Sequence, residues 1–388
     1  MRSTLFAALN LITIFTIGCG SESPANTGDS GTADAIGNTA DGGVQADAKA
    51  PPGLTALGSG EHRLAAMKMT VIATADDGLA QPSDIAFHPK RNNELWITNR
   101  ADDSMVLIFG IDTVKRQAGK ANGPGNQHFL ANPIGLAFGE NGNLATIHDE
   151  DRPTQATTPG TFMGPTLWSS SLTVFNGGHG GHLDMLHNSP LGRGIAWESG
   201  NTYWIFDGAH NSLTRYAFNS DHGPGGSDHR DGDVGRFVEG EVKMVADSPS
   251  HLAYDPKTKL LYVADSGNNR IVVLDTQSGK RGATTLPNFD GSQQYRVDGG
   301  KLTTLIEGSS FDLKRPAGLE IRDNTLYIAD NETGRITAFA LDGKRLDWLD
   351  TELEAGTLFG ITFDDKGRLL AVDSKGNRVL RFETKVGQ

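Results

Sequence analysis

Short runs of β-branched and aromatic residues recur along the chain, separated by turn residues. Within residues 248–275, the first run covers residues 251–254, the second covers 260–264 and the third covers 270–274. Asp, Pro, Gly and Asn fill the two gaps between these runs. Apolar runs of this length between such residues predict three short antiparallel strands joined by turns.

The same pattern returns in five further segments, each with an apolar run followed by a second run that ends in a polar residue. The paired runs are residues 82–87 and 95–99, 133–138 and 144–148, 192–197 and 203–207, 316–321 and 326–330, and 358–363 and 369–373. The units lie roughly 40 to 65 residues apart, which is typical of propeller blades with variable loops. The sequence therefore predicts an all-β fold, a six-bladed β-propeller.

The repeats resemble the NHL repeat, whose pattern runs approximately P-x-G-I/L-A-V/F, then L-Y-V-A-D, then S/T-G-N-N-R-I. Residues 262–271 are the best copy and residues 373–379 are nearly as good. The resemblance covers residues 65–384, and we assign residues 63–388 to the propeller. It implies the fold and leaves the activity open, because propellers support many unrelated functions.

Each blade needs a fourth, outermost strand. Residues 241–245, 301–306 and 345–349 are β-rich runs in suitable places. The chain ends too soon after the sixth repeat to supply another fourth strand, whereas the run at residues 67–73 is unassigned. We expect this N-terminal run to complete the last blade, which closes the ring and removes two open sheet edges.

Residues 1–19 have the pattern of a lipoprotein signal peptide: Arg2, an apolar stretch over residues 5–17, and Gly18-Cys19. Cys19 is the single cysteine and stands where lipidation would occur; the alternative is an ordinary secretory peptide. Residues 20–62 are rich in Gly, Ala, Ser, Thr and Asp, which predicts a flexible tether. We therefore expect an exported lipoprotein of the cell envelope, at the outer membrane or its periplasmic face, attached to the membrane through Cys19.

The charge of the chain bears on its partners. The net charge is −12, and such a surface disfavours nucleic acid, since phosphate binding requires a basic patch. The sequence contains no P-loop, dinucleotide fingerprint or nucleophile elbow that would indicate a common enzyme class. The partner we expect, besides the membrane, is a protein or a small molecule.

One group of candidate residues lies near the propeller axis. We call the side with the connections between second and third strands and between blades the top, and the opposite side the bottom. His148, Asp207, His210 and His251 are predicted near the axis at the top, where imidazole and carboxylate groups could form a metal or catalytic site. His251 and Asp84 occupy a position that holds glycine in other repeats. The alternative is structural, because an Asp that ends a strand commonly bonds the amides of the following turn.

A second group lies in two glycine-rich loops of consecutive blades on the bottom side. The predicted metal ligands are His179, His182, His222, Asp228 and His229. Neutral imidazole suits Zn or Cu better than Ca, so we expect a divalent ion of that kind. The spacing matches neither a zinc helix motif nor an EF-hand loop, and a solvated polar loop is the alternative.

An amidating lyase with this repeat is a zinc enzyme, and its zinc histidines follow the proline that opens the innermost strand. The corresponding positions here contain no histidine: Ser83, Ile134, Arg193, Ser250, Ala317 and Phe359. That active site is therefore not carried over. The leading hypothesis is a ligand- or protein-binding scaffold with a metal-binding loop region; the alternative is a metal-dependent lyase or hydrolase with an axial active site.

Overall fold

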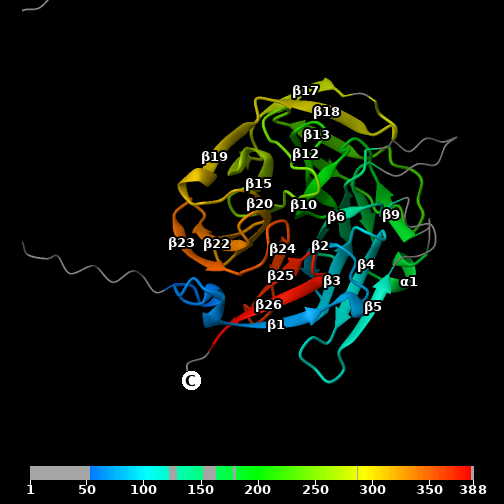
Figure 1. The fold of residues 1–388 in the computed structure, drawn as a ribbon. Coiled ribbons are helices and arrows are strands. Elements are labelled where there is room, and N and C mark those ends of the chain that lie inside the picture. Colours follow the sequence, from blue (N-terminus) through cyan, green and yellow to red (C-terminus); the bar gives the residue numbers. More distant parts are fainter. Residues whose placement is uncertain (1–52, 122–128, 152–162, 178–180, 286, 386–388) are drawn as a thin grey trace, which may run out of the picture. The chain divides into compact units, whose positions relative to one another are not determined.

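The computed structural model describes residues 53–121, 129–151, 163–177, 181–285 and 287–385. Residue contacts divide the chain into residues 1–50 and 51–388, and every described residue belongs to the second unit. Six antiparallel blades surround a central axis in that unit (Figure 1). The fold is a six-bladed β-propeller, as predicted.

The first three blades run in chain order. Blade 1 contains β2 (Pro82–Phe87), β3 (Glu94–Asn99), β4 (Ser104–Phe109) and β5 (Gln117–Ala121). Blade 2 contains β6 (Pro133–Phe138), β7 (Leu144–His148), β8 (Thr166–Trp168) and β9 (His182–Met185). Blade 3 contains β10 (Gly192–Ser199), β11 (Thr202–Asp207), β12 (Ser212–Ala217) and β13 (Asp233–Phe237). The short helix α1 (Leu172–Phe175) lies between β8 and β9.

Of the remaining blades, blade 5 runs in chain order, whereas blades 4 and 6 each take their fourth strand from a more distant part of the chain. Blade 4 contains β14 (Leu252–Asp255), β15 (Leu260–Asp265), β16 (Arg270–Asp275) and β19 (Lys301–Glu307). Blade 5 contains β20 (Pro316–Arg322), β21 (Thr325–Asp330), β22 (Arg335–Ala340) and β23 (Arg345–Asp350). Blade 6 contains β24 (Leu358–Phe363), β25 (Leu369–Asp373), β26 (Arg378–Thr384) and the N-terminal strand β1 (Met67–Ala73).

The N-terminal strand closes the ring, as the sequence predicts. β1 pairs antiparallel with β26 from Met67 opposite Thr384 to Ala73 opposite Val379. Met67 packs into the core between blades 5 and 6, and Ile72 and Ala73 pack into the core between blades 6 and 1. One strand therefore contributes to the apolar contacts on both faces of the last blade.

The fourth strands are predicted correctly in two blades and wrongly in a third. The runs at 301–306 and 345–349 form β19 and β23. In blade 3 the fourth strand is β13, whereas residues 241–245 form no strand. Val242 is buried between blades 3 and 4, and the Lys243 amide donates to Asp265 Oδ1 at 2.7 Å. That run has apolar residues because it packs between blades. Its backbone forms a hydrogen bond with a side chain instead of pairing with a neighbouring strand.

An insertion leaves blade 4 and joins blade 3. Between β16 and β19 the chain forms the hairpin β17 (Lys280–Thr284) and β18 (Gln293–Asp298). β18 pairs in parallel with β13, so the sheet of blade 3 has six strands, and the hairpin lies on its outer side (Figure 1). The loop before β18 reaches blade 2, where the buried Asp290 accepts from His187 Nδ1 at 2.6 Å. The insertion therefore contacts three consecutive blades.

The segment before β1 packs against blade 5. The buried carboxylate of Asp347 accepts from the amides of Leu54 at 2.6 Å and Gly60 at 3.2 Å. The His62 ring stacks on Trp348 with centroids 3.4 Å apart, and Leu57 is fully buried. The last residues of the predicted tether, 53–62, thus contact the propeller. Among the residues described, no helix is long and apolar enough to cross a membrane.

The aspartates that end the second strands have the structural role that the sequence allowed. Asp265 accepts from Arg270 Nε at 2.7 Å, and Asp373 accepts from Arg378 Nε at 2.8 Å. Asp330 accepts from the amide of Thr333 at 2.8 Å. These carboxylates fix the turn between the second and third strands, because they satisfy donors that the ladder leaves unpaired.

Candidate functional site

The four residues predicted to form the axial site do not come together. His148 is buried in blade 2, where its Nε2 lies 2.9 Å from Thr146 Oγ1 and its Nδ1 lies 2.8 Å from the Gly164 carbonyl oxygen. Burial lowers the pKa of His148 to about 4, so its imidazole is neutral at neutral pH. His210 Nδ1 pairs with Asp207 at 2.8 Å at the end of β11. Of the four, His251 lines the cavity described next.

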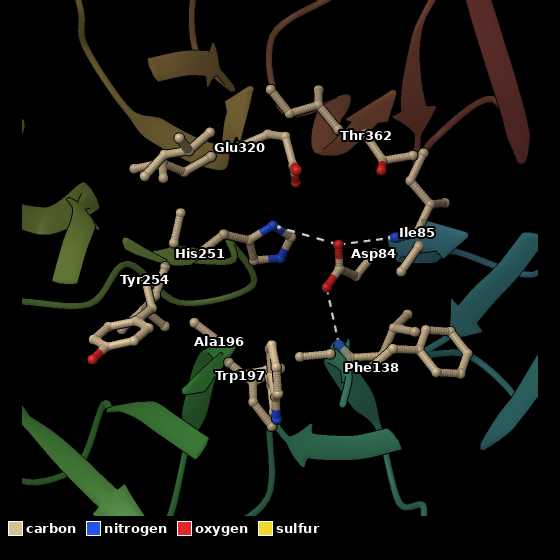
Figure 2. Close-up of a pocket in the computed structure, with 18 of the residues that line it drawn as sticks. Asp84, Ile85, Phe138, Ala196, Trp197, His251, Tyr254, Glu320 and Thr362 are labelled. Carbon is tan, nitrogen blue, oxygen red and sulfur yellow. Dashed lines mark hydrogen bonds and ion pairs between the residues drawn. The ribbon is translucent and has the colours of Figure 1, made fainter. Parts of the chain in front are cut away.

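A cavity of about 400 Å³ lies on the propeller axis. All six innermost strands line it: β2, β6, β10, β14, β20 and β24 (Figure 2). The lining comes from the later residues of each strand, which run toward the bottom connections. A volume of this size is within the range of sites for small molecules.

The residues just before the cavity in each innermost strand close the axis toward the top. They are the six positions compared above with the zinc histidines of the amidating lyase. All six are at most 4% exposed: Ser83, Ile134, Arg193, Ser250, Ala317 and Phe359. Arg193 also pairs with Asp149, which binds Arg100 at 3.0 Å. Among the described residues, buried side chains and these ion pairs occupy this side, and the cavity lining runs toward the bottom.

A polar cluster of Asp84, His251 and Glu320 lies within the cavity (Figure 2). His251 Nδ1 is 3.6 Å from Asp84 Oδ1, and both residues are buried. Asp84 also accepts from the amides of Ile85 at 2.8 Å and Leu136 at 2.9 Å, which fix its carboxyl group. Among the described residues, His251 Nε2 has no hydrogen-bond partner although it is buried. An unsatisfied buried nitrogen costs free energy, so a ligand atom here would be stabilised.

Glycines on neighbouring strands make room for this cluster. Asp84 and His251 occupy a position that is glycine in the other four blades: Gly135, Gly194, Gly318 and Gly360. A Cβ at Gly360 would lie 2.5 Å from Asp84 Oδ1, and a Cβ at Gly194 would lie 2.8 Å from the Cα of His251. Side chains at those two positions would therefore clash with the polar pair.

Glu320 differs from the other members of the cluster in its protonation. Burial, and next the nearby Asp84 carboxyl, raise the pKa of Glu320 to about 8. Burial also raises the pKa of Asp84, and His251 opposes that change. Glu320 therefore keeps its proton at neutral pH and can donate a hydrogen bond to a ligand.

Aromatic side chains form the wall of the cavity nearer the bottom. Five of the six innermost strands carry one at equivalent positions, and each is half-buried: Phe87, Phe138, Trp197, Tyr254 and Phe363. Figure 2 shows Trp197 beside the polar cluster, between Tyr254 and Phe138, whose rings point outward. Aromatic faces beside a few polar groups are characteristic of sites that bind organic ligands.

Sequence reasoning noticed Asp84 and His251 but missed Glu320 and the aromatic wall. A comparison of the chain's own repeats contains the signal. Four of the equivalent positions hold alanine, Ala86, Ala137, Ala196 and Ala253, whereas blade 5 has Glu320 and blade 6 has Thr362. A charged residue in place of alanine beside the axis indicates a local function rather than a requirement of the fold.

The predicted metal ligands are brought together in part. His222 Nε2 lies 2.9 Å from Asp231 Oδ1 and 3.9 Å from Asp184 Oδ2, and His229 Nδ1 lies 2.6 Å from Asp184 Oδ1. His182 stacks on Phe129 with its ring 6.5 Å from that of His229. Asp228 is exposed and pairs with Arg230, so it is outside the cluster.

Two cluster members were not predicted. Asp184 lies on β9 and Asp231 lies just before β13, and each belongs to a stretch in which histidines dominated the sequence signal. His179 lies outside the described residues. The group with metal-ligand spacing is Asp184, His222 and Asp231, whose ligand atoms all lie within 4.8 Å of one another.

Comparisons with known proteins place the fold and nothing finer. No family model and no curated protein matches the chain. An auxiliary nutrient binding protein from Bacteroides thetaiotaomicron aligns with a TM-score of 0.55 at 10% identity, covering 81% of this chain and 76% of its own. One from Bacteroides ovatus aligns with a TM-score of 0.52 at 13% identity, covering 77% and 68%. At such identities the likeness shows the shared propeller fold alone.

Proposed function

We propose that this protein is a lipid-anchored, extracytoplasmic propeller of the NHL type that binds a small uncharged polyhydroxylated molecule in its axial cavity. The observation that carries the proposal is the cavity itself. It combines a buried His251 nitrogen that has no partner in the described part of the chain with two carboxyl groups and an aromatic wall. Such a set of groups can recognise a ligand by hydrogen bonds and by contact with a flat face.

The protonation states of the side chains in the cavity indicate which class of ligand it binds. Protonated Glu320 donates, the Asp84 oxygens accept, and the His251 nitrogen can do either according to its tautomer. Hydroxyl groups satisfy all three, since each hydroxyl is both a donor and an acceptor. Trp197 supplies an apolar surface beside the polar cluster for the C–H surface of a sugar-like ring. An anion is disfavoured, because two carboxyl groups face the same space.

Binding is favoured over the alternative of an axial metal-dependent lyase or hydrolase. Asp84, His251 and Glu320 do not meet the spacing that the Asp184 group meets, so the described axial residues do not form a metal-ligand set. The propellers from Bacteroides described as auxiliary nutrient binding proteins agree with small-molecule binding. A cavity of about 400 Å³ suits a small molecule better than a protein, since a specific protein interface buries about 800 Å² on each partner.

The ligand class is tested by titration. We expect neutral mono- and disaccharides to raise the melting temperature of the purified protein and to bind with a measurable Kd in calorimetry. Trp197→Ala should weaken the best of them about tenfold or more, because it removes a large contact face. His251→Gln should weaken it as well, since the substitution displaces the ring nitrogen.

Phe289→Ala is the matched control, because Phe289 is an exposed aromatic residue on the outer insertion. It should bind as the parent does. An equal Kd for the parent and Trp197→Ala would place the ligand outside the cavity. Binding of organic amines and of no sugar would replace the proposed ligand class by a cationic one.

The proposed anchor depends on Cys19, with residues 1–19 as the signal peptide and residues 20–62 as the tether. Cys19→Ala should move the protein from the membrane fraction of the producing bacterium to the soluble envelope fraction, because the lipid is lost. Immunoblots of the two fractions measure the change. Ser21→Ala, two residues away, should remain with the membrane, and membrane retention of Cys19→Ala would contradict the anchor.

A further inference from the structure

We propose that Asp184, His222 and Asp231 bind one first-row divalent transition ion between blades 2 and 3, at a site separate from the axial cavity. The site uses one imidazole nitrogen and two carboxylate oxygens, whose ligand atoms lie within 4.8 Å of one another. This set replaces the histidine-rich one that the sequence favoured. The proposal is independent of the ligand proposed for the axis.

Asp184 carries the proposal, because its carboxyl group is fully buried and only one of its two oxygens accepts hydrogen bonds from the described residues. Its Oδ1 accepts from His229 Nδ1 at 2.6 Å and from the amide of Met185 at 2.7 Å. Its Oδ2 is buried and has no hydrogen-bond partner among the described residues. Leaving a buried carboxylate oxygen unpaired is costly, and a cation is the partner that offsets most of that cost.

The unpaired oxygen points toward a second blade. Asp184 Oδ2 lies 3.9 Å from His222 Nε2, which lies 2.9 Å from Asp231 Oδ1. Ligands about 2.1 Å from a tetrahedral ion are separated by about 3.4 Å, so these distances bracket the spacing required. His222 and Asp231 are partly exposed, with side chains 21% and 35% accessible. An ion could therefore enter from solvent and keep a water ligand.

The loop that carries His222 is fixed in the position this geometry needs. Asp231 Oδ2 accepts from the Ser220 amide at 3.1 Å, and the Gly225 amide donates to the His182 carbonyl oxygen of β9 at 2.8 Å. A Cβ at Gly226 would lie 2.6 Å from the Cβ of His222. The loop therefore folds back closely beside His222 and rests on the strand that holds Asp184.

The donor set indicates the class of ion. Calcium and magnesium prefer oxygen ligands alone, whereas an imidazole with carboxylates suits zinc and its first-row neighbours. His229 forms a hydrogen bond with the other oxygen of Asp184, as the outer residues that orient metal ligands commonly do. A protonated His222 that bridges the two carboxylates is the rival occupant of the same space, and it needs no metal.

Zinc titration separates these possibilities. The full chain, purified without a histidine tag and stripped with chelator, should bind one Zn²⁺ per molecule in calorimetry. Asp184→Asn and His222→Gln should each weaken the Zn²⁺ Kd at least about 100-fold, because each removes one of three ligands. Asp228→Asn is the matched control: it changes a carboxylate of the same loop that pairs with Arg230 and does not belong to the ligand group, and it should bind as the parent does.

The outcomes decide the proposal in both directions. Circular dichroism in the presence of chelator shows whether each variant is folded. If Asp184→Asn fails to fold, Asp231→Asn replaces it in the Zn²⁺ titration, because Asp231 is partly exposed. A parent that binds no stoichiometric Zn²⁺ leaves the protonated His222 bridge as the explanation and overturns the proposal. Unchanged Zn²⁺ affinity in Asp184→Asn, with loss in His182→Gln, would also overturn it by moving the ion to the histidines.

Discussion

A truncation that begins at Asp76 should lose at least about 5 kcal/mol of unfolding free energy, because it removes β1 and the segment before it. Leu57, Met67 and Ile72 are all buried, and burying each such side chain contributes about 1.5–3 kcal/mol. Removing β1 also exposes the edge of β26. A loss of this size is comparable with the whole stability of many domains. Denaturant unfolding measures it, with aggregation as the expected side effect.

A truncation that begins at Pro51 is the control. It keeps every residue that the structure describes and should unfold as the mature protein does. If the two truncations unfold at the same denaturant concentration, β1 does not hold the ring closed in solution. A truncation that begins at Met67 should fall between them, because it keeps the strand but removes Leu57 and the two amides bound by Asp347.

Glu320→Gln should remove most of a pH dependence of stability that the axial cluster creates. The ordinary pKa of a glutamate is 4.5, whereas burial and Asp84 raise that of Glu320 to about 8. Between these values the folded protein holds a proton that the unfolded chain has released, so stability falls as pH rises through this window. The shift corresponds to on the order of 3 kcal/mol after allowance for partial exposure of the carboxyl group.

Urea unfolding at pH 5, 7 and 9 measures the effect. Glutamine resembles the protonated acid, so parent and variant should agree at pH 5, and the variant should be the more stable at pH 9. Glu332→Gln, which breaks an exposed pair with Arg315 in the same blade, should follow the parent at every pH. Parallel profiles for the parent and Glu320→Gln would show that Glu320 ionises normally.

The sequence predicts the fold well because the strand pattern can be recognised within each repeat separately. The second strands are buried on both faces by neighbouring blades, so they appear as continuous apolar runs such as residues 326–329 within β21. The fourth strands are harder to predict, because they lie at the outside and lack that pattern. β13 was missed for this reason, since it lies in a polar, glycine-rich stretch.

The sites could be predicted less completely, because their residues meet across blades. His251 and Asp84 were noticed by their departure from glycine, and the same comparison applied to alanine would have found Glu320. Asp184 and Asp231 each belong to one half of a contact between blade 2 and blade 3. No spacing within either stretch encodes that contact, since it depends on how two sheets pack. The abundance of histidines indicated the region of the metal site but not the residues that could bind the metal.

The insertion between β16 and β19 should make blades 2 to 4 more resistant to local opening than the rest of the ring. It leaves blade 4, extends blade 3 through β18, and reaches blade 2 through the buried pair of Asp290 and His187. Two successive blade interfaces are thus spanned by one continuous piece of chain, so they cannot separate unless the insertion detaches first. Local opening should therefore begin at interfaces outside blades 2 to 4. Blades 2 to 4 should therefore hold their half of the axial cavity wall in place while the rest of the ring fluctuates.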